Sequence, residues 1–237
     1  MIHLITYGDE KYNNTKKRLY NEALNTRWFD SITLYNQHDL NNNFKKRFKR
    51  ILEESRGGGY WIWKPYVIKK KLDEINDGDV LIYLDAGCSI NSNGKQRLDE
   101  YVNMLKTSNS GVISFQMHQH LEKVWTTKEI FNSFNIDIND NIANTGQIIG
   151  GIVVLIKNAN SVKLVNMWNN TLINNPLLFT DYYKNQYPYF NENRHDQSIF
   201  SIIRKLHNPI LLEDETSFQF GDNLSLKYPF WATKIRE

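Results

Sequence analysis

An apolar run in the first half of the chain ends at a carboxylate. Residues 80–84 are all apolar or aromatic, and Asp85 follows them directly. A run this short and continuous is typical of a strand that is buried on both faces of a sheet. In open α/β sheets, ligands bind just outside the carboxyl ends of such strands. Because a carboxylate there needs a cation or hydrogen-bond donors, we expect Asp85 to contact a metal–diphosphate or the hydroxyl groups of a sugar nucleotide.

A glycine loop with two flanking cations precedes this strand. Gly57, Gly58 and Gly59 lie between Arg56 and Lys64, and a predicted helix starts at Pro65. The loop is not a P-loop, because no Gly-Lys-Ser/Thr sequence follows it. Glycines nevertheless let the backbone approach a ligand, and a helix start presents free N–H groups to an anion. We therefore expect a diphosphate site in which Arg56 and Lys64 supply the charge.

Aromatic and polar side chains near these two segments are further candidates. Trp61 follows the glycines and would either stack on a ring of a ligand or anchor the loop in the core. Thr6 ends the first predicted strand and Tyr7 begins the loop after it, where nucleotide-binding α/β folds contact the base and ribose. A simple surface loop at this point is the alternative interpretation.

The order of predicted elements indicates an α/β fold. Apolar segments at 2–6, 31–35, 79–84, 111–117, 148–156 and 210–212 alternate with helical patterns at 15–27, 43–54, 65–76, 94–107, 159–174 and 196–206. No repeat or low-complexity linker divides the 237 residues. We predict one domain, 1–237, with a mixed, mostly parallel sheet and helices on both faces.

Composition excludes several classes of protein. The chain is 41% hydrophobic and 23% charged, as globular proteins are, and its net charge is only +3. Its basic clusters at 16–18, 45–50 and 69–71 fall in predicted helices, so they are either solvated helix faces or contacts with an anionic membrane. A nucleic-acid partner is not expected, since no recognisable binding module is present.

The sequence also predicts a cytoplasmic protein. Cys88 is the only cysteine, so no disulfide forms within the chain. The amino terminus lacks the pattern of a signal peptide, and no apolar run approaches the ~18 residues of a membrane span.

Three blocks of the sequence together resemble a family of small GT-A-fold glycosyltransferases found in bacterial surface-glycan systems and large DNA viruses. They are residues 60–66 (YWIWKPY), 81–88 (LIYLDAGC) and 194–198 (RHDQS), and the resemblance spans about residues 2–212. The resemblance implies a GT-A, Rossmann-like domain that transfers a sugar from a nucleotide-diphosphate sugar, with uridine diphosphate as the expected carrier. The acceptor would be a hydroxyl group of a glycan or glycoconjugate.

The resemblance also assigns roles at the carboxylate. Asp85 matches the first acid of the Asp-X-Asp motif and would contact the donor, with Ala86 and Gly87 beside it. Gly87 replaces the second acid, which usually contacts the metal. Mn²⁺ or Mg²⁺ would then be held by Asp85, phosphates and water alone. In the absence of a metal, Arg56 and Lys64 would neutralise the diphosphate.

Asp196 is the second catalytic candidate. It lies at the start of a predicted helix, where an N-cap role is the simplest interpretation. The resemblance implies that it faces the sugar. It would act as the general base in an inverting reaction or hold the donor sugar in a retaining one.

Five residues are candidates for binding the acceptor. By analogy with the family, Thr145 and Gln147 line the acceptor side, although a glycine-kinked strand also explains their segment. Glu122 and Trp125 follow a strand, with Glu122 as a rival base, and His195 precedes Asp196. Two other functions remain open at this point: a sugar nucleotidyltransferase, and a degenerate module that only binds nucleotide or glycan.

Overall fold

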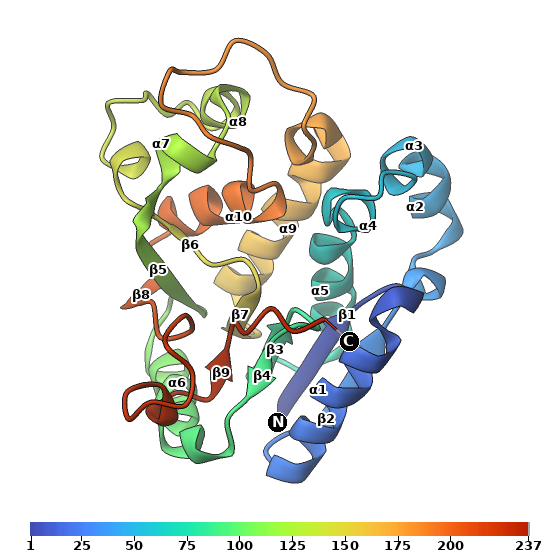
Figure 1. Cartoon of the computed structure of the whole chain (residues 1–237), viewed down its shortest axis with the longest axis vertical. Coiled ribbons are helices and arrows are strands. Elements are labelled where there is room, and N and C mark those ends of the chain that lie inside the picture. Colours follow the sequence, from blue (N-terminus) through green and yellow to red (C-terminus); the bar gives the residue numbers. More distant parts are fainter. Residues whose placement is uncertain (237) are drawn as a thin grey trace.

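Seven strands form one mixed sheet through the middle of the molecule (Figure 1). The computed structural model describes residues 1–236. The strands follow the order β2-β1-β3-β7-β5-β6, and β8 also pairs with β5. Their bounds are β1 (Ile2–Tyr7), β2 (Ser31–Tyr35), β3 (Val80–Leu84), β5 (Val112–Leu121), β6 (Gly146–Ile148), β7 (Ile152–Ile156) and β8 (Ile210–Glu213). A two-stranded ribbon pairs β4 (Ser89–Ile90) with β9 (Phe230–Trp231).

The sheet is mostly parallel, as the sequence predicts. Strands β1, β2, β3, β5 and β8 run in one direction, whereas β6 and β7 run in the other. Strand β1 pairs in parallel with β3, and Leu4 lies opposite Ile82. Since parallel neighbours end at the same edge of a sheet, Tyr7 and Asp85 come to the same side of the molecule.

Helices cover both faces of this sheet (Figure 1). Helices α1 (Asn13–Thr26) and α6 (Lys95–Thr107) contribute to one hydrophobic cluster. Helices α5 (Trp63–Glu74), α9 (Ala159–Asn174) and α10 (Asp196–Lys205) contribute to the other. The shorter helices are α2 (Asn42–Arg47), α3 (Lys49–Leu52), α4 (Gly57–Tyr60), α7 (Glu122–Trp125) and α8 (Lys128–Ser133). The 3₁₀ turns are η1 (Glu10–Tyr12), η2 (Gln37–Asp39), η3 (Ser92–Gly94), η4 (Ile142–Asn144), η5 (Pro176–Phe179) and η6 (Ser225–Lys227).

Strand β3 is apolar throughout because both of its faces are buried. Its five residues are all buried. Leu81 and Tyr83 join the cluster that contains α5 and α9, while Ile82 and Leu84 join the cluster on the opposite face. Burial of an aliphatic side chain of this size contributes about 1.5–3 kcal/mol to folding. The strand is therefore a rigid base for the residue that follows it, Asp85.

Two predicted elements differ from the structure. The expected strand at 148–156 is two strands, β6 and β7, which both pair antiparallel with β5 and are separated at residues 149–151, where Gly150 approaches a helix. A Cβ atom at Gly150 would lie 2.7 Å from the Cβ of Gln197, at the start of α10. The expected helix at 43–54 is two short helices that meet at Phe48. No helix in the described part of the chain, residues 1–236, is long and apolar enough to cross a membrane.

Candidate active site

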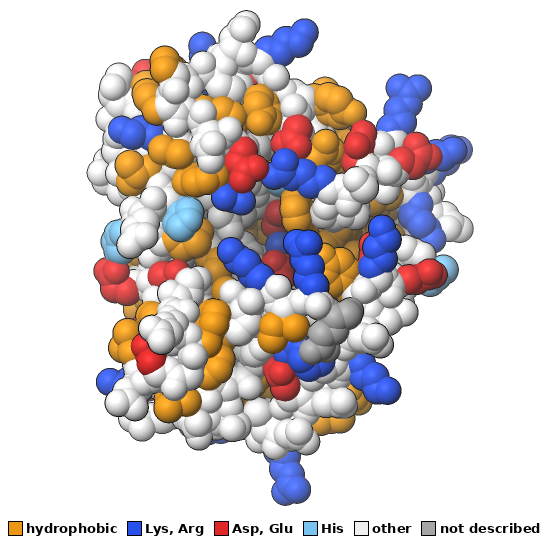
Figure 2. Space-filling model, in the orientation of Figure 1, with side chains coloured by type: hydrophobic (Ala, Val, Ile, Leu, Met, Phe, Trp, Pro, Cys, Tyr) orange, Lys and Arg blue, Asp and Glu red, His pale blue; other side chains and the backbone are white. Residues whose placement is uncertain are grey.

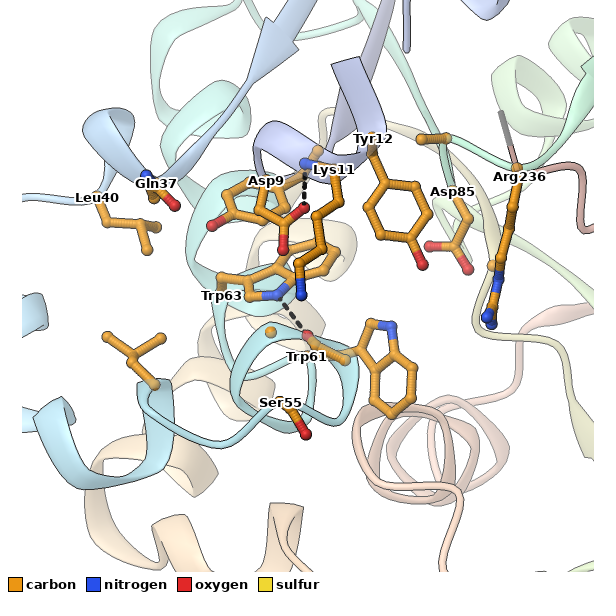
Figure 3. Close-up of a pocket in the computed structure, with 18 of the residues that line it drawn as sticks. Asp9, Lys11, Tyr12, Gln37, Leu40, Ser55, Trp61, Trp63, Asp85 and Arg236 are labelled. Carbon is orange, nitrogen blue, oxygen red and sulfur yellow. Dashed lines mark hydrogen bonds between the residues drawn. The ribbon is translucent and has the colours of Figure 1, made fainter. Parts of the chain in front are cut away.

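A cavity of about 770 Å³ opens where β1 and β3 end (Figures 2 and 3). Its volume lies within the range of about 300–1,000 Å³ that is usual for small-molecule sites. Its walls come from the segments after β1, β2 and β3, from the glycine turn before α5, and from the segment 232–236. In Figure 1, this last segment crosses in front of β3 and reaches the end of β1. The cavity lies at the sheet edge where the sequence predicts a ligand.

Asp85 stands in the wall of this cavity and is held in place by its neighbours. The Tyr83 hydroxyl donates a hydrogen bond of 2.5 Å to Asp85 Oδ1. The backbone N–H of Asp85 donates to the carbonyl of Gly151 over 2.8 Å. A Cβ atom at Gly151 would lie 2.8 Å from Oδ2, so glycine leaves room for the carboxylate. The side chain is 38% exposed. Asp85 is thus fixed in orientation and open to a ligand.

Lys64 links Asp85 to a second carboxylate. Its ammonium lies 3.2 Å from Asp85 Oδ1 and 2.8 Å from Asp196 Oδ2, and it donates to the Gly150 carbonyl over 3.2 Å. Burial alone would lower the pKa of Lys64, but the charges of Asp196 and Asp85 outweigh burial and raise it. The ammonium therefore stays protonated between the two carboxylates.

Asp196 is the more deeply buried of these carboxylates. It is the first residue of α10 and not the N-cap that the sequence predicts. His195 is the N-cap, with a positive φ of 55°. Burial raises the pKa of Asp196 to about 6, although the charge of Lys64 opposes this shift. Its Oδ2 atom makes no hydrogen bond among the described residues, so the short contact with Lys64 is an ion pair without hydrogen-bond geometry. The helix N-terminus favours the ionised form.

His195 packs beneath the glycine turn. Its Nδ1 atom lies 2.9 Å from the carbonyl of Phe179, and its ring centre lies 5.1 Å from that of Tyr60 and 5.3 Å from that of Trp61. Burial lowers the pKa of His195, so the ring is neutral and its Nδ1 carries the proton that the carbonyl accepts. The ring is 2% exposed and does not line the cavity.

The glycine turn presents backbone and aromatic rings to the cavity. Its residues 57–61 all have positive φ angles, which is costly for residues other than glycine. Gly57 and Gly58 line the cavity together with Trp61 and Trp63. The Trp63 indole donates to the Gly57 carbonyl over 3.0 Å and stacks on Tyr7, with ring centres 3.9 Å apart (Figure 3). Trp63 is therefore a cavity residue, like Trp61.

Three expected donor contacts do not reach the cavity wall: Thr6, Arg56 and Lys64, the last of which is 2% exposed. The Arg56 side chain is not part of the cavity wall, and its guanidinium forms ion pairs with Asp181 at 3.2 Å and Glu192 at 2.8 Å. Thr6 is buried in β1, and its hydroxyl has no hydrogen-bond partner among residues 1–236. The glycine turn therefore contributes its backbone and its tryptophans to the wall, while the charge of Arg56 is used elsewhere.

The structure does not bring Glu122 to the cavity. Its side chain has no exposed surface and pairs with Lys205 at 2.9 Å. The Thr126 hydroxyl donates to its Oε2 atom over 2.7 Å, and the Ser201 hydroxyl donates to Oε1. We therefore assign Glu122 a structural role in place of the acceptor contact, or rival base, expected from the sequence.

The remaining acceptor candidates also lie outside the cavity wall. Gln147 is fully buried and donates to the hydroxyls of Thr126 and Ser198. Thr145 accepts a hydrogen bond from Lys205. Trp125 packs under the guanidinium of Arg194, whose central carbon lies 4.2 Å from the ring centre. Gln147 and Thr145 thus contact residues of α10, and Trp125 contacts Arg194 just before this helix.

Sequence reasoning missed the contribution of the segment 232–236. The Ile235 N–H donates to the Gly87 carbonyl over 3.0 Å, and the Thr233 hydroxyl donates to the same carbonyl over 2.8 Å. These bonds bring Lys234 and Arg236 into the cavity wall beside the turn after β3. The only signal in the sequence is the pair of basic residues itself, and nothing in the sequence indicates that it lies beside residue 87.

The fold is that of GT-A-type glycosyltransferases. A glycosyltransferase involved in the glycosylation of the major capsid of PBCV-1 superimposes with a TM-score of 0.54, at 10% identity over 97% of this chain and 92% of that one. Mouse xyloside xylosyltransferase 1, in its apo form, gives a TM-score of 0.50 at 10% identity, over 98% of this chain and 97% of that one. No protein-family model and no curated protein matches the sequence.

Proposed function

We propose that this protein is a glycosyltransferase that moves a sugar from a nucleotide-diphosphate sugar to a hydroxyl group of a glycan or glycoconjugate. The observation that carries the proposal is the Asp85–Lys64–Asp196 cluster beside a cavity at the carboxyl edge of a GT-A sheet. A fixed, ligand-accessible carboxylate at this point suits recognition of ribose or sugar hydroxyl groups.

The two ends of the cavity suit different parts of such a donor. Toward one end, Trp63, Gln37 and Leu40 provide aromatic, polar and aliphatic surface for a base (Figure 3), and Tyr7 stacks on Trp63. At the other end, Asp85 faces the space left for the sugar. We propose uridine as the base, on the strength of the sequence resemblance alone.

The burial of Asp196 favours one role over the other. A general base must reach the proton that it accepts, whereas Asp196 is only 3% exposed and its charge is paired with Lys64. We therefore propose that Asp196 is a positioning residue that holds Lys64, and through Lys64 the carboxylate of Asp85. In this arrangement Asp85 is the catalytic residue that touches the donor.

A panel of nucleotide sugars tests the function. Ligand at 100 times its Kd stabilises a folded protein by about 2.7 kcal/mol, which for a chain of this size raises Tm by about 5–11 °C. We expect at least one donor to give such a shift and to be hydrolysed slowly. Asp85→Asn should abolish the shift, whereas Asp99→Asn, an exposed acid paired with Lys95 on α6, should not change it.

Two outcomes would contradict the proposal. If no nucleotide sugar stabilises the wild-type protein, the cavity is not a donor site. If donors bind without hydrolysis or transfer to any glycan acceptor, the protein is a binding module. The sequence raises this alternative because Gly87 replaces the second acid of the motif.

A further inference from the structure

Gly87 is enclosed by the segment 232–236. A Cβ atom at this position would lie 3.0 Å from the carbonyl oxygen of Ile235 and 3.3 Å from the Cα of Lys234. The backbone of Gly87 also accepts the two hydrogen bonds from this segment described above. Even a Cβ atom at residue 87 would therefore require this backbone to shift by a few tenths of an ångström. The place of a second carboxylate is filled by backbone that carries Lys234 and Arg236.

The donor set around Asp85 does not fit a protein-built metal site. Metals such as Mg²⁺ and Mn²⁺ prefer several oxygen ligands. Asp85 Oδ1 already accepts from Tyr83 and lies beside the Lys64 ammonium, which leaves Oδ2 as its free oxygen. Among residues 1–236, no group of three or more His, Cys, Asp or Glu side chains is placed to hold a metal ion. The charge of a diphosphate must be met by other means.

The cations expected to meet that charge are already neutralised. Arg56 is paired with Asp181 and Glu192, and Lys64 with Asp85 and Asp196. Both cations therefore contribute little net positive charge to a ligand in the cavity. Arg56 and Lys64 are therefore poorly suited to neutralise the diphosphate, the role that the sequence suggests for them in a site without a metal.

Four other cations in the cavity wall, among them Lys45 of α2, have no such partner. Lys11, Lys45, Lys234 and Arg236 line the cavity, and within the described residues no carboxylate oxygen lies within 4.0 Å of a side-chain nitrogen of any of them. Figure 3 shows the side chains of Lys11 and Arg236 extending into the cavity, with Tyr12 and Asp85 between them in this view. Figure 2 shows Lys and Arg side chains gathered around a hollow near the middle of this face.

We propose that Lys234 and Arg236, together with Lys11, bind the diphosphate of the donor, and that the donor binds without a divalent metal. This inference rests on the proposed function and adds the means of charge stabilisation. Arg and Lys both form charge-assisted hydrogen bonds with phosphate oxygens. In the transfer, the bond between the sugar and the β-phosphate breaks and its electron pair stays on the diphosphate. The acceptor oxygen bonds to the sugar, and its proton passes to water. The three cations stabilise the charge that develops on the leaving diphosphate.

Calorimetry with UDP and uridine tests the proposal, because the two probes differ only in the diphosphate. In EDTA, the wild-type protein should bind UDP, and added Mn²⁺ should change its Kd less than threefold. A hydrogen bond to a charged group is worth about tenfold or more in affinity. The double variant Lys234→Ala/Arg236→Ala should therefore weaken UDP binding by roughly 100-fold in EDTA and leave uridine binding unchanged.

A matched control lies nearby in the chain. Lys227 is exposed and does not line the cavity, so Lys227→Ala should bind UDP as the wild type does. Thermal melting of each variant confirms that it folds. The inference is overturned if EDTA weakens wild-type UDP binding tenfold or more, or if the double variant binds UDP like the wild type.

These outcomes are separate from failure of the proposed function. If neither UDP, GDP nor dTDP binds the wild-type protein with or without Mn²⁺, the glycosyltransferase proposal fails, and this inference with it. If UDP binds only with Mn²⁺, the glycosyltransferase proposal stands and the metal-free inference alone is wrong.

Discussion

Replacing Lys64 by Met should destabilise the protein, and the loss should grow with pH. Lys64 is 2% exposed and lies between Asp196 at 2.8 Å and Asp85 at 3.2 Å. Met retains much of the side-chain volume and removes the charge, so the packing changes little. The main consequence is a buried carboxylate at Asp196 that has lost its cation.

The size of the effect follows from burial and from the pKa of Asp196. Removing one partner of a buried ion pair costs about 3–5 kcal/mol. In the wild type the folded-state pKa of Asp196 is raised from 3.8 to about 6. A raised pKa favours folding at low pH, and this advantage is lost as the pH rises through the folded-state value. In the wild type the loss is therefore complete slightly above pH 6.

Without Lys64 the pKa of Asp196 rises further, because Lys64 opposes the effect of burial. The variant should then continue to lose stability above pH 6, where the wild type no longer does. The slope for one proton is about 1.4 kcal/mol per pH unit. The difference in the free energy of unfolding between the two proteins should widen at this rate until the pKa of the variant is reached.

Urea denaturation at half-unit steps from pH 5 to 8 measures this difference. Lys64→Met, Asp196→Asn and the double variant complete a double-mutant cycle. The double variant should lose the pH slope, since no ionisable group remains at residue 196. Lys69→Met is the matched control, because Lys69 pairs with Asp73 on the surface at 2.9 Å and such pairs contribute about 0–1 kcal/mol.

A constant difference between Lys64→Met and the wild type from pH 6 to 8 would refute the reasoning. So would a slope that persists in the double variant, because the titrating group would then be another residue.

Two further predictions concern activity. The rate of donor hydrolysis should fall as the pH drops through about 6, because protonation of Asp196 removes the partner of Lys64; a rate that stays constant down to pH 5 would contradict this role. Gly151→Ala should weaken donor binding by up to about 100-fold, because its Cβ would lie 2.8 Å from Asp85 Oδ2 and would displace the carboxylate. Isothermal calorimetry checks this second prediction, and unchanged affinity would show that the position of Asp85 does not matter.

Local sequence patterns predicted the sheet well, because the relevant information is local. Five consecutive apolar residues at 80–84 can be buried only where both faces of a strand are covered, and Asp85 marks the end of that strand. The break at Gly150 was harder to interpret. The apolar segments on either side of it look alike, and the close approach of Gln197 explains why the strand is interrupted there.

The charges of the site could not be assigned from sequence, because their partners lie far along the chain. Arg56 and Lys64 look equivalent beside the glycines, yet Arg56 pairs with Asp181 and Glu192, while Lys64 pairs with Asp196. Each pairing depends on how the segments after α9 return to the sheet. The same limit applies to Glu122, whose burial against Lys205 has no local signature.

The docking of Lys234 and Arg236 beside Gly87 has a consequence for biosynthesis. Tyr7, the first cavity residue in the chain, leaves the ribosome some 230 residues before Arg236 does. At 5–20 residues per second this interval is about 10–50 s. The sheet is complete only once β8 has emerged, about 23 residues before Arg236, so it can assemble during the last ~1–5 s of this interval while the cavity lacks one side. A nascent chain would therefore fold before it can hold a diphosphate, so the ability to bind ligand would appear only when translation has passed residue 236.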